Sequence, residues 1–397
     1  MTRTIGVGVI SLGWMGRLHT RAYRALKERF PEIDADIRLV SCCDPIEDNQ
    51  RQATEVLGFE RACADYHDVI NDPDVDVVSI CSPNFLHHPI AMAAIEAGKP
   101  FWIEKPMGVS AAQSRDIAEG ADAKGLTTSV GFNYRHTPAI QYARQLIADG
   151  KLGRITNARV WLIADYASDP NGPLTWRYEN ERAGAGVILD LMGHGEDLLQ
   201  YVLRDRITSV TALTDTFIKE RPIPLKAGVG HTGWEVSDER GPVGNDDYVS
   251  ILAKLESGAV ATLESCRVSV GPRAEYIIEV YGTEGSIRWN FEDLNHIDVC
   301  IGRDNGALQG YVRAMAGPDF PDFMRFQPGA GTSMGFDDMK VIEASLFIKG
   351  VLDGAQYGPS AADGWNTAEV DDAVIASAAD GSWHDVAPVS GRVTYNV

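Results

Sequence analysis

The sequence lacks any run of eighteen or more apolar residues, which is about the length that a helix needs to cross a bilayer. The apolar run near the N-terminus ends at Leu12 and has no small-residue cleavage site, so we do not interpret it as a signal peptide. Basic residues are also few, with 36 Lys and Arg against 56 Asp and Glu and a net charge of −20. This balance disfavours nucleic acids and anionic membranes as partners. We therefore expect a cytoplasmic protein that acts on a small molecule.

The six cysteines lack the C-x-x-C spacing that is typical of zinc sites and redox motifs. Most of them lie in apolar, strand-like surroundings, as reduced core thiols do. We expect no disulfide framework and no metal site. Internal repeats and low-complexity tracts are absent as well, and 397 residues are enough for two domains.

A glycine turn beginning at Gly184 leads into a predicted helix over residues 187–203. At about 100° per residue, Asp190, His194 and Asp197 fall within an arc of roughly 60°. A solvated stripe of paired side chains would give the same pattern. However, the glycines on either side of His194 cost helix stability, about 1 kcal/mol each, and leave open backbone beside the imidazole. A carboxylate one turn away also orients an imidazole for proton transfer, so this helix is a candidate catalytic element.

A strand over residues 5–10 precedes the pattern S-x-G-x-x-G and a helix that extends to about Leu26. This is the context of a dinucleotide-binding fingerprint, in which the second glycine admits the pyrophosphate and the third allows close helix–strand packing. The amides at the start of the helix then face the phosphates. The cofactor-binding residues expected in this loop are Ser11, Gly13, Trp14, Met15 and Gly16.

Asp44 ends a second predicted strand over residues 37–43. An acid at this position accepts the ribose hydroxyls of NAD and repels the 2′-phosphate of NADP. The alternative interpretation is a capping residue for the helix that follows.

Further strands over residues 75–81, 101–103 and 127–130 alternate with helices, which predicts an α/β, doubly wound parallel sheet. Ligands of such sheets bind beyond the carboxyl ends of the strands. Lys105 lies at one such end between Glu104 and Pro106, and a lysine held there is a candidate general acid or base. The expected cofactor-binding residues at these ends are Ser82, Pro83, Asn84, Glu104 and Lys105.

The periodicity changes in the second half of the chain, where strands follow one another without intervening helices. We expect a large, mainly antiparallel sheet with one open face. A Gly- and Pro-containing stretch over residues 218–246 is expected to be a long loop. The predicted strands are 155–163, 207–214, 247–255, 259–266, 276–281 and 286–289, and the predicted helices are 336–352 and 367–378.

Aromatic and polar side chains gather just before the candidate catalytic helix. Such a mixture suits sugars, which present hydroxyl edges and apolar C–H faces, although each residue alone is more typical of packing. The residues concerned are Trp161, Asp165, Tyr166, Asn171, Trp176, Arg177 and Tyr178.

Taken together, these motifs resemble the glucose–fructose oxidoreductase / inositol dehydrogenase / MocA (Gfo/Idh/MocA) family, and the resemblance covers nearly the whole chain. It is carried by the Ser11–Gly16 turn, Ser82-Pro83-Asn84 with His87, Ala97-Gly98-Lys99, Glu104-Lys105-Pro106, and Asp190 with His194 and Asp197. The sequence departs from the family pattern at Ser11, where the first glycine is expected, and at Met192.

The resemblance implies a Rossmann NAD-binding domain (1–130), followed by an α/β domain for substrate binding and oligomerisation (131–397). It implies a homodimer or homotetramer formed through the open sheet, and Lys105, Asp190 and His194 as the catalytic set. The runs 133–139 and 168–177 most resemble family members that oxidise C3 of levoglucosan, a 1,6-anhydro sugar, with NAD. Further cofactor contacts are then expected from His87, Asn133, Trp176 and Arg177, and substrate contacts from Lys105, Tyr134, Arg135, Asp165, Tyr166, Trp176, Asp190, His194 and Asp197.

The expected reaction is hydride transfer from a secondary ring alcohol to the nicotinamide. Lys105 and His194 both qualify as proton acceptor, and the sequence leaves the choice open because a coupled pair titrates as a unit. The alternatives are a myo- or scyllo-inositol dehydrogenase and a glycosidase that uses NAD transiently, which would need a further acid/base group. A nucleotide sensor without turnover would not need the three catalytic candidates.

Overall fold

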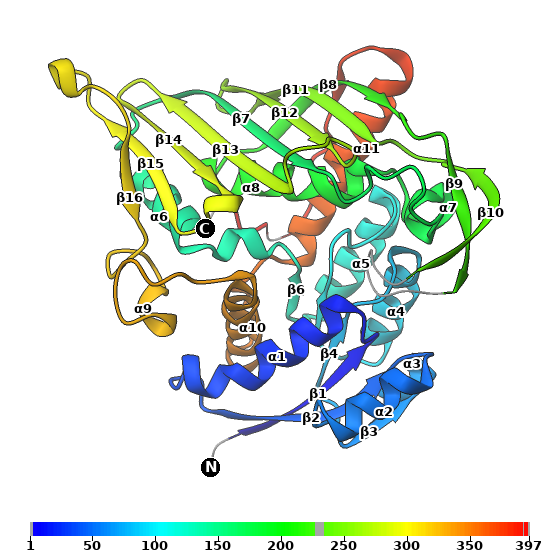
Figure 1. Ribbon diagram of the computed structural model, residues 1–397. Helices are drawn as coiled ribbons and strands as arrows, with labels where there is room; N and C mark the ends of the chain where they lie inside the picture. Colours follow the sequence, from blue (N-terminus) through cyan, green and yellow to red (C-terminus); the bar gives the residue numbers. More distant parts are fainter. Residues whose placement is uncertain (1–2, 227–233, 392, 396–397) are drawn as a thin grey trace. The chain divides into compact units, whose positions relative to one another are not determined.

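The computed structural model describes residues 3–226, 234–391 and 393–395. The chain forms two compact units (Figure 1). Unit 1 comprises Met1–Asn133, Phe336–Trp365 and Ser390–Thr394, and unit 2 comprises Tyr134–Gly335, Asn366–Val389 and Tyr395–Val397. The contacts thus group residues 336–365 with the first unit, whereas a single boundary after residue 130 placed them in the second.

Unit 1 contains a six-stranded parallel sheet in the order β3-β2-β1-β4-β5-β6, which confirms the doubly wound prediction. Its strands are β1 (Arg3–Ile10), β2 (Ala35–Cys43), β3 (Arg61–Cys63), β4 (Val77–Ile80), β5 (Phe101–Ile103) and β6 (Thr128–Val130). Its main helices are α1 (Trp14–Arg29), α2 (Glu47–Glu55), α3 (Tyr66–Ile70), α4 (Asn84–Glu96), α5 (Ala111–Ala123) and α10 (Phe336–Asp353).

The central strands of this sheet are buried on both faces, as their continuous apolar runs predict. All four residues of β4 are buried, as are the last six of β1. Helix α5 begins after Ser110, whose side chain accepts a hydrogen bond from the amide of Gln113. This cap satisfies a donor that the first helical turn leaves open.

Unit 2 contains a nine-stranded mixed sheet in the order β16-β15-β14-β13-β7-β12-β11-β8-β17. All six predicted strands are confirmed; β12 runs parallel to β7 and the other neighbours are antiparallel. The strands are β7 (Ile155–Ala164), β8 (Ile207–Asp215), β11 (Tyr248–Leu255), β12 (Val260–Cys266), β13 (Ala274–Gly282), β14 (Gly285–Asn290), β15 (His296–Ile301), β16 (Val312–Met315) and β17 (His384–Asp385).

One face of this sheet is covered by helices, and along β11 and β12 buried and exposed residues alternate. Helix α8 (Gly193–Leu203) packs on β7, and α6 (Pro138–Ala148) packs on β14 (Figure 1). Helix α11 (Ala361–Asp380) is longer than the predicted 367–378, and the division between the two units falls within it.

The predicted long loop over residues 218–246 is wrong in its main feature. It contains β9 (Glu220–Lys226) and β10 (Glu235–Pro242), which pair antiparallel as a separate two-stranded sheet; residues 227–233 lie outside the described part of the chain. The sequence did not predict β9 because Pro222 and Pro224 lie within it, and prolines are typical of loops. In a two-stranded sheet both strands are edges, where a missing N–H donor is tolerated.

The predicted helix over residues 187–203 is also not uniform. Its first part, Ile188–Met192, is a π-helical turn, and α8 continues from Gly193. Within the described residues, no helix combines the length and apolarity needed to span a bilayer.

Candidate functional site

The glycine-rich loop of unit 1 has the geometry that the fingerprint requires. Ser11, in the place of the first glycine, adopts a positive φ of 75° and donates its amide hydrogen to the carbonyl of Cys43 over 2.7 Å. A Cβ atom on Gly16 would lie 1.8 Å from the carbonyl oxygen of Ser11, so this position excludes side chains. No described atom lies within 4 Å of the corresponding point on Gly13, which leaves the backbone there open to a ligand. The loop thus presents the start of α1, with Trp14 exposed.

Asp44 ends β2 beside this loop and is 3% exposed. Its Oδ2 accepts a hydrogen bond from the amide of Leu12 over 2.8 Å. Its Oδ1 accepts from the amide of Ile46 (2.9 Å) and from Nδ2 of Asn49 (3.1 Å). A carboxylate has about four acceptor positions, so in this arrangement one remains for a ribose hydroxyl rather than the two that a diol would use. The side chain does not cap α2 from the N-cap position, which is Ile46.

His87 braces the ends of two strands. It is 1% exposed; its Nδ1 lies 2.7 Å from the carbonyl oxygen of Pro106 and its Nε2 lies 2.8 Å from that of Ser82. Burial lowers the pKa of this imidazole. Both ring nitrogens therefore face backbone carbonyl oxygens of the segments after β4 and β5. A neutral imidazole has one N–H, so one of these two oxygens accepts its hydrogen bond. Of the other residues expected here, Pro83 and Asn84 are half-buried at the start of α4, and Asn133 is buried at the end of the unit's first segment.

Glu104 belongs to a buried ionic network. One oxygen, Oε1, lies 2.8 Å from Nε2 of His19 and 2.5 Å from Nζ of Lys340. Burial opposes ionisation of Glu104, but the charge of Lys340 outweighs it and holds the pKa of this carboxyl well below its usual range. Burial lowers the pKa of His19 to about 4, and the neutral ring stacks on Trp102. This network anchors the end of β5, and the next residue, Lys105, is half-buried.

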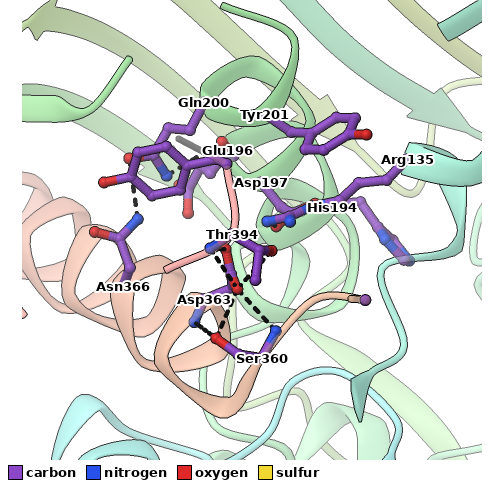
Figure 2. Close-up of polar contacts among 12 residues, drawn as sticks. Arg135, His194, Glu196, Asp197, Gln200, Tyr201, Ser360, Asp363, Asn366 and Thr394 are labelled. Carbon is purple, nitrogen blue, oxygen red and sulfur yellow. Dashed lines mark hydrogen bonds and ion pairs between the residues drawn. The ribbon is translucent and has the colours of Figure 1, made fainter. Parts of the chain in front are cut away.

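In unit 2, the three residues of the predicted stripe, Asp190, His194 and Asp197, differ in burial and in their partners. Asp190 in the π-turn and His194 in the first turn of α8 are half-buried. Asp197 is 3% exposed and forms a buried ion pair with Arg135, whose Nε donates to Oδ2 over 2.8 Å (Figure 2). The sequence did not predict this ion pair between Asp197 and Arg135.

One aromatic ring contacts the imidazole of His194, and two more aromatic residues lie close to it. The ring of Tyr134 lies edge-on to the imidazole, with 4.7 Å between centroids, and contacts Phe291 at 5.1 Å. The hydroxyl of Tyr276 donates to the carbonyl oxygen of His194 over 2.6 Å. Tyr134 was expected at the site; Tyr276 and Phe291 were missed, because only the sheet register brings residues so distant in sequence to this helix.

Hydrogen bonds fix both the side chain of Asp190 and the start of the turn in which it lies. The hydroxyl of Tyr166 donates to its Oδ2 over 2.6 Å. On the other side, the carboxylate of Asp246 accepts from the amides of Gly186 (2.7 Å) and Ile188 (3.1 Å), where the π-turn begins. Asp246 was missed, because it lies in the predicted loop and acts only through tertiary contacts.

The segment over residues 165–178 is fixed by several cations. Asp165 pairs with Arg273 at 2.5 Å, and the ring of Tyr178 lies between the guanidinium groups of Arg221 and Arg267. Of the predicted sugar-binding set, Tyr178 is buried and the other six residues are half-buried or exposed. Arg177 lies over the ring of Trp176 at 4.5 Å. Among the described residues, no group of three or more His, Cys, Asp or Glu side chains is arranged to hold a metal ion.

The chain matches known proteins over its whole length. It is 35% identical to levoglucosan dehydrogenase from Pseudarthrobacter phenanthrenivorans over 394 residues, or 98% of this chain and 100% of that protein. It is 25% identical to myo-inositol 2-dehydrogenase from Thermotoga maritima over 71% of this chain and 74% of that protein. A structure of levoglucosan dehydrogenase in complex with NADH and levoglucosan superposes with a TM-score of 0.90 at 34% identity, covering 97% of this chain and 100% of that one.

Two family models also match. Residues 5–132 match the oxidoreductase family with an NAD-binding Rossmann fold, and residues 140–288 match the GFO/IDH/MocA C-terminal domain. These matches confirm the resemblance read from the sequence motifs. The open glycine loop, the parallel sheet and the helix-covered mixed sheet all agree with them, and the chain belongs to the GFO/IDH/MocA family of NAD-binding oxidoreductases.

Proposed function

We propose that this oxidoreductase is a sugar dehydrogenase that oxidises a secondary ring hydroxyl of a neutral pyranose, namely C3 of levoglucosan or of a related pyranoside. The observation that carries this proposal is the setting of His194, which is half-buried, in edge-on contact with the ring of Tyr134, and one turn from the Asp190 carboxylate that Tyr166 holds. Aromatic faces suit the C–H groups of a sugar ring, and the acid and imidazole suit its hydroxyls. The full-length similarity to levoglucosan dehydrogenase supports the same substrate class.

In this proposal the glycine loop and the start of α1 hold the pyrophosphate of NAD, and Asp44 accepts one ribose hydroxyl. The open backbone at Gly13 and the amides of the first helical turn fit that group. When bound, NAD accepts the hydride. The protein must then remove the hydroxyl proton of the sugar, and Lys105 or His194 takes it, with Asp190 orienting the acceptor. The activity of a Lys105→Ala variant tests whether Lys105 is the acceptor.

A cyclitol is the second candidate substrate, because myo-inositol 2-dehydrogenase is among the relatives. A cyclitol offers the same secondary hydroxyls on an all-carbon ring but has no ring oxygen or anomeric centre. The test is NADH formation by the purified protein with levoglucosan, methyl glucosides, L-sorbose, and myo- and scyllo-inositol. Product analysis by NMR then locates the keto group. A product oxidised elsewhere than C3, or a clear preference for an inositol, would overturn the specific assignment and leave the dehydrogenase class.

We also propose that the open face of the nine-stranded sheet mediates a homodimer or homotetramer. The exposed apolar side chains Leu213, Leu252 and Val260 point to one face of β8, β11 and β12, as the strand register shows. Light scattering coupled to size-exclusion chromatography tests this, and a monomer at micromolar concentration would contradict it.

A further inference from the structure

The hydrogen bond between Tyr166 and Asp190 is short, and Tyr166 is the donor. Its O–O distance of 2.6 Å is in the range of charge-assisted bonds to a carboxylate. Burial, followed by the charge of Asp190, raises the pKa of the Tyr166 phenol far above its usual range. The phenol therefore keeps its proton at neutral pH and acts as the donor. Such a donor holds a carboxylate in its ionised form and in one orientation.

The chain beside Tyr166 is held in place by a residue of a buried ion pair. The amide of the next residue, Ala167, donates to the carbonyl oxygen of Arg267 over 3.0 Å. The Nε of Arg267 donates in turn to Oδ1 of Asp247 over 2.7 Å, and these two side chains are 1% and 0% exposed. The phenol thus projects from a fixed chain segment, although Tyr166 lies beyond the end of β7.

The Asp190 carboxylate projects from a π-turn. A π-turn is wider than an α-helical turn, is rare, and occurs frequently at functional sites. Asp246 fixes the backbone where the turn begins, through Gly186 and Ile188. The Asp190 carboxylate is half-buried, and the Tyr166 hydroxyl supplies a direct contact that fixes its side-chain torsions.

We propose that Tyr166 is a positioning residue: its hydroxyl fixes the Asp190 carboxylate in the orientation that acts on the proton acceptor, and does not bind the sugar. The inference rests on the proposed dehydrogenase function and replaces the substrate-binding role expected for Tyr166 from the sequence.

The test compares Tyr166→Phe with the matched variant Tyr281→Phe. Tyr281, on β13, also donates to a carboxylate, Oε2 of Glu279, over 2.9 Å, so both changes remove one phenol–carboxylate bond and keep the ring. For Tyr166→Phe we expect kcat to fall about 10- to 100-fold, the cost of a slightly misplaced reacting group. The KM for the sugar and the affinity for NADH should change less than about threefold, as for a loss confined to the transition state. Tyr281→Phe should leave all three values unchanged.

Crystal structures of both variants give a readout that does not depend on turnover. The Asp190 carboxylate should rotate or adopt two orientations in Tyr166→Phe and keep its position in Tyr281→Phe. A raised KM with unchanged kcat would show that the phenol binds the sugar, and an unchanged kcat with an unmoved carboxylate would show that the bond is dispensable; either result overturns the inference. Wild-type protein that turns over no sugar or cyclitol would refute the proposed function instead, and the position of Asp190 would still decide the role of Tyr166.

Discussion

Gly16 and Ser11 approach each other so closely that a Cβ atom on residue 16 would lie 1.8 Å from the Ser11 carbonyl oxygen. Gly16→Ala must therefore shift the backbone where α1 begins. We expect a loss of about 1–3 kcal/mol in the free energy of unfolding, as for other overpacked sites, together with weaker NADH binding. Thermal unfolding and a fluorescence titration with NADH measure the two effects.

Gly13→Ala is the matched control, because no described atom lies within 4 Å of its Cβ position. This variant should keep the wild-type melting temperature and lose NADH affinity, since the added methyl group occupies the space where the pyrophosphate approaches. Equal NADH binding by wild type and Gly13→Ala would show that the cofactor does not approach this loop.

Lys105→Ala tests the lysine of the proposed catalytic set. Loss of a positioned acid or base typically lowers the rate by about 10²–10⁴-fold, and we expect kcat to fall in that range while NADH still binds. Lys99→Ala is the control, because Lys99 precedes the same strand, β5, and donates to the Asp72 carbonyl oxygen rather than taking part in the site. A Lys105→Ala variant with nearly normal kcat would leave His194 as the proton acceptor.

Asp44 should determine the choice between NADH and NADPH. The wild type should bind NADH more tightly, because the carboxylate attracts a ribose hydroxyl and repels a 2′-phosphate. Hydrogen bonds to charged groups contribute about 1.5–3 kcal/mol, so Asp44→Ala should weaken NADH binding roughly 10- to 100-fold. The difference in affinity between NADH and NADPH should become smaller. Fluorescence titrations with both nucleotides measure this, and a wild type that binds NADPH equally well would refute it.

Glu196 should make the protein less stable as the pH rises. It is 0% exposed on α8, and burial, together with the charge of Asp371, raises the pKa of Glu196 far above its usual range. A folded-state pKa above the unfolded one means that this residue stabilises the fold fully below about pH 4.3. That stabilisation is then lost by about 1.4 kcal/mol per pH unit as the pH rises towards the folded-state pKa.

Glu196→Gln keeps the shape of the side chain and removes its titration. Relative to wild type, the variant should gain stability progressively from about pH 5 to pH 8, as measured by urea unfolding at several pH values. Glu256 is exposed, so the free energy of unfolding of Glu256→Gln should depend on pH in the same way as that of the wild type. A constant difference between Glu196→Gln and wild type over this range would contradict a raised pKa.

The fold was largely predictable because its signals are local. Buried strands alternating with helices indicated the parallel sheet of unit 1, and consecutive strands without intervening helices indicated the mainly antiparallel sheet of unit 2. The spacing of Ser11, Gly13 and Gly16 predicted a loop geometry that depends on backbone conformation alone.

The candidate site was less predictable because its geometry depends on tertiary contacts. The arc that grouped Asp190 with Asp197 assumed a regular α-helix, whereas Asp190 lies in a π-turn and Asp197 pairs with Arg135, and spacing indicated neither feature. Asp246 carried no motif, since its role comes from two amides about sixty residues away in sequence. His87 was recognised as a motif residue, but its two carbonyl partners could not be inferred from spacing.

Lys340 lies far along the chain from Glu104, yet the two are joined at 2.5 Å in the interior of unit 1. A fragment that stopped at residue 133 would leave the Glu104 carboxylate buried beside His19 without its lysine, and an unpaired buried charge costs several kcal/mol. The nucleotide-binding unit of this enzyme therefore cannot be exchanged as one continuous segment with a single boundary. A chimera with a relative must exchange residues 336–365 together with the N-terminal segment. Glu104 and Lys340 then come from the same parent protein.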